Sequence, residues 1–255
     1  MSLLKIQGLT QKFGGLQAVS DFNLELSQGA LAGLIGPNGA GKTTLFNLTS
    51  GFYQPTEGQI LFNDRNTRGL KPHQVTGLGI ARTFQNIRLW NDMTVFDNVR
   101  VAQHHALGYN LVDALFRSRR YRRSEQRISL RAHDILDAMS LSEYALELPK
   151  NLPYGLQRRV EIARAMALDP KLLLLDEPAA GLNSSDVEDL IQLIRWIHDE
   201  FKVTIWMIEH QMKVVMSLCT EIQVIDFGAT IAEGTPEQIR SDPAVIKAYL
   251  GDENI

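Results

Sequence analysis

The 255-residue chain is poor in several features, and each shortage excludes a class of protein or of site. Its one cysteine, Cys219, excludes an internal disulfide and a cysteine-rich metal site, and we expect a reduced thiol within a helix. No apolar run approaches the roughly 18 residues that a membrane-spanning helix requires. Residues 1–6 lack the charged-then-apolar order of a signal peptide. We therefore expect a protein of a reducing compartment that does not itself span a membrane.

Neither sign of charge is in large excess. The net charge is −3, so nothing global indicates nucleic acid or an anionic membrane as a partner. Hydrophobic residues make up 44% and charged residues 22% of the chain, the composition of an ordinary soluble protein. There is no internal repeat and no low-complexity linker. A chain of this length is either one large domain or a domain with an inserted subdomain, and it can bury a substantial core.

The hydrophobic pattern that is present predicts an α/β fold. Residues 3–9 and 22–26 alternate like strands of an antiparallel edge sheet. Further strands, several of them unbroken apolar runs, are predicted at 31–35, 59–62, 80–84, 172–176, 203–208 and 222–226. Helices at 184–201 and 211–219 separate the later strands. Alternation of strand and helix predicts a mostly parallel sheet with helices on its faces.

A phosphate-binding loop follows the predicted strand at 31–35. Residues 36–43 fit the pattern G-x-x-x-x-G-K-[ST] between that strand and a helix over 43–50. Glycines let backbone N–H groups curl around phosphate oxygens, and the helix N-terminus adds partial positive charge. Lys42 would reach the β- and γ-phosphates, and Thr43 would ligate Mg²⁺. The residues expected to bind the nucleotide are Gly36, Asn38, Gly39, Ala40, Gly41, Lys42, Thr43 and Thr44.

Two acidic residues occur at the end of the most apolar predicted strand. Asp176 stands at the carboxyl end of the strand that begins at Leu172, where ligand sites form in α/β sheets. Glu177 is the next residue, and we expect its side chain to point toward the position of an attacking water. An ordinary strand followed by acidic loop residues would look the same in isolation. The phosphate-binding loop favours a functional pair.

Together, the loop and residues 151–183 resemble the ATP-binding cassette family. Residues 157–165 match the helix that follows this family's signature turn, and the strand with its two carboxylates comes next. The resemblance implies that Asp176 orders the magnesium shell and that Glu177 is the general base of ATP hydrolysis. It also implies a catalytic role for Lys42.

Three more residues take their roles from the same resemblance. Gln85 follows a strand and precedes a helical stretch, like the family's Q-loop glutamine, which contacts Mg²⁺ or water and senses the position of the helical insert. His210 follows the strand at 203–208 and resembles the switch histidine at the γ-phosphate. Phe13 is similar to the family's adenine-stacking aromatic residue. Without the resemblance, each would be interpreted as a structural residue.

The signature turn departs from the commonest family pattern, Leu-Ser-Gly-Gly-Gln. Here residues 152–156 are Leu-Pro-Tyr-Gly-Leu. Pro153 has neither a hydroxyl nor a backbone N–H to offer a phosphate, and Leu156 cannot hydrogen-bond where glutamine could. The N–H groups of Tyr154 and Gly155 remain available to ATP. We therefore expect this turn to contact the γ-phosphate weakly.

The pattern and the resemblance together predict two domains. Residues 1–85 and 151–255 are expected to form the nucleotide-binding core, with a P-loop NTPase fold of mostly parallel sheet and an antiparallel edge sheet. Residues 86–150 show no strand candidate and are expected to form an inserted helical subdomain. The signature helix at 153–168 is expected to pack at the end of that subdomain.

Several segments look like the cassettes of bacterial branched-chain amino-acid importers. They are residues 81–90, 93–99, 151–159, 178–183, 208–210 and 249–251. Related cassettes for urea or other amino acids and for lipopolysaccharide export share some of these segments and remain alternatives. A soluble cassette ATPase without a role in transport is a further alternative, although such proteins usually carry two cassettes or a long coiled-coil insert.

The family resemblance implies a working unit larger than this chain. Two cassettes would close face to face on two ATP molecules, each site completed by the partner's signature turn. The weak turn favours a second cassette that is related but not identical. Two membrane-spanning permease subunits are the other direct partners, a periplasmic substrate-binding protein is an indirect one, and no nucleic acid is expected. The expected location is peripheral, on the cytoplasmic face of the inner membrane.

One basic segment has no role in these assignments. Residues 117–131 hold seven arginines and a single acid, Glu125. Such a segment meets nucleic acid or lipid headgroups, or it is the solvated face of a helix. The sequence favours the solvated helix and leaves the other two interpretations open.

Overall fold

The computed structural model describes residues 2–250, without the side chains of His105, Ala106 and Leu250. Gly251, the last residue of the importer-like closing segment, lies outside the described residues, as does the end of the predicted core domain. The chain divides into two compact units. The first unit is Met1–Gln85 with Lys171–Ile255, and the second is Asn86–Pro170.

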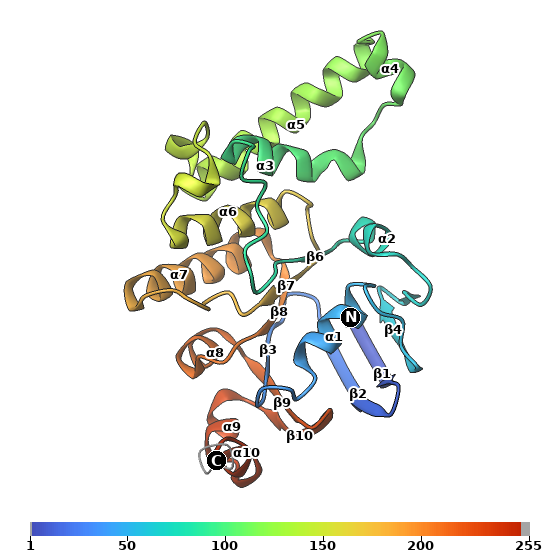
Figure 1. Cartoon of the computed structure of the whole chain (residues 1–255), viewed down its shortest axis with the longest axis vertical. Coiled ribbons are helices and arrows are strands. Elements are labelled where there is room, and N and C mark those ends of the chain that lie inside the picture. Colours follow the sequence, from blue (N-terminus) through green and yellow to red (C-terminus); the bar gives the residue numbers. More distant parts are fainter. Residues whose placement is uncertain (1, 251–255) are drawn as a thin grey trace. The chain divides into compact units, whose positions relative to one another are not determined.

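A mixed sheet forms the centre of the first unit (Figure 1), with the strand order β10-β9-β3-β8-β7-β6 in the part of the chain that is described. Strands β9 to β6 run parallel, and β10 pairs antiparallel with β9. All residues of β3, β7 and β8 are buried, as expected of parallel strands covered on both faces. The strands are β3 (Leu31–Ile35), β6 (Ile80–Arg82), β7 (Leu172–Asp176), β8 (Thr204–Ile208), β9 (Glu221–Asp226) and β10 (Ala229–Gly234).

An antiparallel sheet of order β2-β1-β4-β5 completes the strands of this unit. The two sheets share one hydrophobic core. Trp206 of β8 is fully buried there, with its ring 6.3 Å from that of Phe22 and 4.9 Å from that of Phe46. The strands are β1 (Ser2–Phe13), β2 (Leu16–Ser27), β4 (Glu57–Phe62) and β5 (Arg65–Asn66). The predicted antiparallel edge sheet is confirmed, with longer strands than expected.

The helices of the first unit are α1 (Lys42–Thr49), α2 (Pro72–Gly77), α7 (Ser184–Phe201), α8 (Met212–Leu218), α9 (Pro236–Ser241) and α10 (Pro243–Leu250). Helix α7 shows why these segments are helical. Its buried residues recur at the three- and four-residue spacing of one helix face, from Val187 to Ile197. The Asn183 side chain accepts a hydrogen bond from the N–H of Asp186 and caps the start, and Lys202 ends the helix in a left-handed conformation.

Cys219 corrects one detail of the prediction. It was expected within a helix, but it caps the C-terminus of α8 with extended backbone, because the chain turns there into β9. The thiol is buried and free. Burial raises the pKa of Cys219 to about 12, with a smaller contribution from Glu209, so the thiol is protonated and unreactive.

The second unit is helical. Its described residues include α3 (Val95–Ala102), α4 (Leu111–Leu115), α5 (Arg119–Ala138) and α6 (Tyr154–Met166), with short 3₁₀ turns at Gln103–Ala106, Ser142–Tyr144 and Pro149–Asn151. Helix α3 packs against both α5 and α6. No strand is found in its described part, as the sequence predicts.

The compact units differ from the expected domains at one boundary. The expected domains and the observed units share a boundary after Gln85. The second boundary lies after Pro170 in the structure, whereas the sequence predicts it between residues 150 and 151. The signature helix therefore belongs to the helical unit, because α6 packs against α3 and α5. No helix of the described chain is long and apolar enough to cross a bilayer.

Candidate active site

One side of the loop between β3 and α1 packs closely against the backbone of neighbouring segments. A Cβ at Gly36 would lie 2.0 Å from the carbonyl oxygen of Ile225. At Gly41, where φ is 105°, a Cβ would lie 2.4 Å from the carbonyl oxygen of Ala18. Only glycine fits either position, so the backbone can curl back on itself and leave its other side open. Gly39 lies on that open side, since a Cβ there would meet no atom within 4 Å.

The start of α1 has the properties of an anion site. No side chain caps the helix at Gly41, and no acidic residue lies in its first turn. The first N–H groups of a helix lack partners within it and carry partial positive charge. The buried Nζ of Lys42 donates to the carbonyl oxygens of Gly36 and Pro37, at 2.6 and 2.7 Å, and so lies over the same loop. The loop therefore fits a polyphosphate.

Lys42 lies in the field of the two predicted carboxylates. Burial lowers the pKa of Lys42, and the charges of Glu177 and Asp176 oppose that shift. The structure thus brings Lys42 close to Asp176 and Glu177, although Lys42 is far from both carboxylates in the chain.

Asp176 forms a buried ion pair that the sequence did not reveal. Arg82 Nη2, at the end of β6, donates to Asp176 Oδ2 over 2.7 Å. The other guanidinium nitrogen, Nη1, donates to Asn47 Oδ1 at 2.7 Å and to Ser50 Oγ at 3.0 Å, both in the α1 region. The Arg82 guanidinium also lies 5.1 Å from the centroid of the Phe84 ring. Arg82 therefore fixes the direction of the Asp176 carboxylate relative to the loop helix.

Glu177 is held by two polar side chains. Its backbone is left-handed, with φ of 46°, and its N–H donates to the carbonyl oxygen of Ile208 at 2.9 Å. Gln85 Nε2 donates to Glu177 Oε2 at 2.6 Å, and His210 Nε2 lies 2.6 Å from Oε1. An ionised carboxylate only accepts, so the His210 nitrogen is the donor when Glu177 is ionised. A carboxylate fixed in this way can accept a proton from a bound water.

Glu209 is a third carboxylate of the site, and the sequence pattern predicts no role for it. It is 2% exposed and accepts hydrogen bonds from the N–H groups of Ala179, His210 and Gln211, at 2.7, 3.0 and 3.2 Å. Burial raises the pKa of Glu209, although the three N–H groups oppose the shift. Glu209 joins the loop after β7 to the residue that holds Glu177. The sequence feature that could have identified Glu209 is its position between a buried strand and a histidine.

The remaining predicted residues lie in different places. Phe13 ends β1 with 43% of its surface exposed, and its ring lies 5.3 Å from the ring of Tyr53, edge to face. Its exposed part is available to a stacking ligand. Tyr154 and Gly155 open α6 in the second unit, and Pro153 occupies the capping position with φ of −52°. These residues do not belong to the unit that contains the loop.

The donor set suits a hard cation. The Thr43 hydroxyl, the Asp176 carboxylate and the Gln85 amide oxygen are all oxygen ligands, which Mg²⁺ prefers. Among the described residues, no three histidine, cysteine or acidic side chains are grouped as a protein-only metal cage. A cation shared between a single carboxylate, these neutral oxygens and substrate phosphates fits this arrangement.

Two family models match the chain. The model described as ABC transporter matches residues 19–180. The model described as branched-chain amino acid ATP-binding cassette transporter matches residues 229–254. The first match contains the phosphate-binding loop, Asp176 and Glu177.

A curated relative is similar over almost the whole chain. It is the high-affinity branched-chain amino acid transport ATP-binding protein BraF of Pseudomonas aeruginosa. The two sequences are 48% identical over 250 residues, and the match covers 98% of this chain and 98% of BraF. A solved structure, the ADP conformation of an ATP-binding cassette of an ABC transporter, superposes with a TM-score of 0.86 at 29% identity, over 98% of this chain and 99% of that one.

A dimeric cassette is also similar to the chain. Its structure represents a post-hydrolysis state bound to ADP and Pi. The TM-score is 0.76 at 26% identity, and the match covers 91% of this chain and 98% of that one.

Proposed function

The chain belongs to the ABC transporter family, whose ATPase cassettes hydrolyse ATP, and from this membership we propose that it drives a bacterial importer of branched-chain amino acids. One observation carries the catalytic part of the proposal: Glu177 is held by Gln85 and His210 beside the phosphate loop. The match of residues 229–254 and the similarity to BraF support the cargo.

In the proposed mechanism, the loop N–H groups and Lys42 bind and orient the β- and γ-phosphates of ATP. Glu177 accepts a proton from a water molecule whose oxygen forms a bond to the γ-phosphorus. The bond from that phosphorus to the bridging oxygen breaks, which releases ADP and phosphate. His210 and Gln85 hold Glu177 in the direction of this water, and Lys42 stabilises the negative charge that develops.

Mg²⁺ is part of the same proposal. Thr43, Asp176 and Gln85 would hold it, and Arg82 keeps the Asp176 carboxylate in a fixed direction. The bound ion supplies charge neutralisation at the phosphates. Phe13 would stack on the adenine, and the N–H groups of Tyr154 and Gly155 would contact the ATP of a partner cassette.

The proposed working unit contains a second cassette, two permease subunits and, indirectly, a periplasmic binding protein. The similarity to a dimeric cassette supports the cassette pair. Pro153 and Leu156 weaken the signature turn, which favours a partner cassette that is not identical. The chain would then lie peripherally at the cytoplasmic face of the inner membrane. A cassette for urea, for other amino acids or for lipopolysaccharide export is the alternative cargo assignment.

The test is transport by the assembled complex. The chain is reconstituted in proteoliposomes with its partner cassette, the permease subunits and the periplasmic binding protein, and ATP is supplied on the side of the membrane that the cassettes face. We expect uptake of leucine or isoleucine that depends on ATP and is lost with Glu177→Gln. ATP hydrolysis stimulated by urea or lipopolysaccharide but not by these amino acids would contradict the proposed cargo. Hydrolysis that no membrane subunit stimulates would contradict a transport role.

A further inference from the structure

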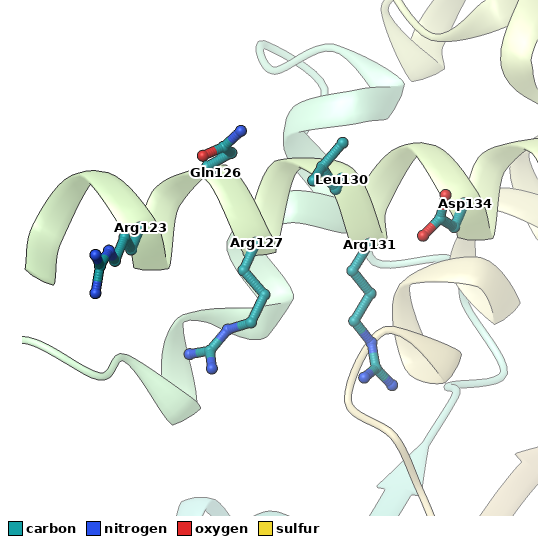
Figure 2. A pocket seen from close by; sticks show the side chains of 6 residues that line it. All are labelled: Arg123, Gln126, Arg127, Leu130, Arg131 and Asp134. Carbon is teal, nitrogen blue, oxygen red and sulfur yellow. The ribbon is translucent and has the colours of Figure 1, made fainter.

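The N-terminal half of α5 forms an arginine pocket that has no part in ATP hydrolysis. The pocket has a volume of about 580 Å³. It is lined by Gly108, Arg119, Arg120, Arg123, Ser124 and Arg127. A second pocket of about 590 Å³ continues along the same helix (Figure 2) and shares Arg123 and Arg127 with the first. Figure 2 shows Arg127 and Arg131 on one side of α5. The basic surface is therefore continuous over several turns.

Two acids of the helical unit are already paired with other arginines, and a third, Asp134, lines the second pocket beyond Arg131. Glu125 accepts hydrogen bonds from Arg100 Nη2 at 2.5 Å and from the Tyr109 hydroxyl at 2.6 Å. Burial opposes the shift, but these two donors lower the pKa of Glu125, so its charge is already neutralised by Arg100. Asp169 pairs with Arg131 at 2.9 Å. Within the described chain, none of the four arginines of the first pocket forms an ion pair.

A buried hydroxyl points to the ligand of this pocket. Ser124 lines it, is 5% exposed, and its Oγ has no hydrogen-bond partner among the described residues. A Cβ built on Gly108 would lie 3.8 Å from that oxygen and 3.6 Å from Arg127 Nη2. A hydroxyl donor and a guanidinium therefore flank the same glycine. Together they match the needs of a phosphate group, which accepts from both kinds of donor.

The helix next to this half of α5 carries exposed apolar side chains. In α4 and directly after it, Leu111 is 89% exposed, Val112 63%, Leu115 78% and Phe116 75%. Helix α4 packs against α5, and Figure 1 shows it at the N-terminal end of α5. Neighbouring exposed apolar residues of this size mark an interaction surface rather than ordinary surface.

We propose that α4 and the N-terminal half of α5 bind the surface of an anionic phospholipid membrane. The arginines and Ser124 would hold lipid phosphates, and the leucines and phenylalanine would enter the boundary between headgroups and acyl chains. Nucleic acid would bind the arginines through its phosphates, but it has no apolar region to cover the four exposed apolar side chains. The net charge of the chain, −3, also does not favour nucleic acid as a partner. The proposal does not depend on which cargo the transporter carries.

The test measures co-sedimentation of the full chain with vesicles of phosphatidylcholine, alone or mixed with phosphatidylglycerol. We expect binding to the mixed vesicles only, weakened by salt. The variant Arg123→Gln/Arg127→Gln changes both pockets and should lower the partition coefficient about five-fold per arginine, which corresponds to about 1 kcal/mol for each charge near an anionic surface. The variant Leu111→Ser/Leu115→Ser keeps every charge and should also lower it.

The matched control is Arg65→Gln/Arg68→Gln, which removes two exposed charges from the first unit and should leave binding unchanged. An equal loss in this control would mean that net charge alone attracts the chain, and the proposal would be wrong. The proposal would also be wrong if Leu111→Ser/Leu115→Ser binds the vesicles as well as the original chain does, or if the original chain does not bind anionic vesicles. Calorimetry with inorganic phosphate and a gel shift with duplex DNA complete the test. Binding of either one without vesicle binding would overturn the lipid assignment.

Discussion

Among the described residues of the first unit, Arg82 and Asp176 form the most deeply buried ion pair, at 2.7 Å with side chains only 6% and 4% exposed. The pair joins the ends of two neighbouring parallel strands, β6 and β7, where the predicted magnesium ligand lies. A carboxylate placed this deeply needs a charged partner, and it has one that also bonds α1 through Asn47 and Ser50.

Replacing Arg82 by methionine should therefore destabilise the protein. The change leaves Asp176 buried without its partner, which costs about 3–5 kcal/mol in the free energy of unfolding. Chemical denaturation measures this loss. The double variant Arg82→Met/Asp176→Asn removes both charges and should recover part of it. A loss that is the same with and without the Asp176 substitution would show that the ion pair contributes little.

Glu177→Gln should separate ATP binding from hydrolysis. The amide keeps the shape of the side chain but cannot accept a proton, so hydrolysis should fall roughly 10²–10⁴-fold, as is typical for the loss of a general base. Steady-state phosphate release and equilibrium binding of a fluorescent ATP analogue measure the two properties. The exposed Glu200→Gln change is the matched control and should affect neither. Near-normal hydrolysis by Glu177→Gln would remove Glu177 from the catalytic role.

Glu209 should give the folded protein a measurable pH dependence. Its pKa in the folded state is raised above the ordinary value of 4.5, mainly by burial. The folded state then binds a proton that the unfolded state releases, so the contribution of Glu209 to stability is present below about pH 4.5 and is lost as the pH rises through the raised pKa. The difference in unfolding free energy between the original chain and Glu209→Gln should decline over that window. A flat difference would contradict the shift.

Gln85 should matter more to transport than to basal hydrolysis. Its amide bonds Glu177 at the last residue before the helical unit, so it is placed to relate the position of that unit to the catalytic carboxylate. We expect Gln85→Ala to reduce hydrolysis by the isolated chain modestly and transport by the reconstituted complex severely. Equal losses in both assays would make Gln85 a catalytic ligand without a coupling role.

The signature turn should limit pairing of identical chains. Light scattering of the Glu177→Gln chain with ATP and Mg²⁺ should show mainly monomer, because Pro153 and Leu156 remove polar groups from the turn. Adding Pro153→Ser and Leu156→Gln restores those groups and should increase the ATP-dependent dimer. A tight dimer at low micromolar concentration without these two changes would show that the N–H groups of Tyr154 and Gly155 suffice.

The central strands were predictable because their chemistry is local. Leu172–Asp176 is a run of four leucines that ends in an aspartate, Leu31–Ile35 is apolar throughout, and the structure confirms both sets of bounds. Arg82 was not predictable as the partner of Asp176, because the two lie 94 positions apart and its neighbours in the strand are ordinary. The end of the helical unit was missed for a similar reason. Helix α6 belongs there through packing against α3, which no local pattern reveals.

The position of Trp206 between Phe22 and Phe46 provides an optical reporter of the nucleotide-binding unit. A fully buried indole emits at shorter wavelength than an indole in water, so separation of the two sheets would shift its fluorescence to the red. The other two tryptophans, Trp90 and Trp196, are 47% and 37% exposed and already have aqueous contact. A chain in which both are replaced by phenylalanine would let one spectrum follow the melting of this core alone.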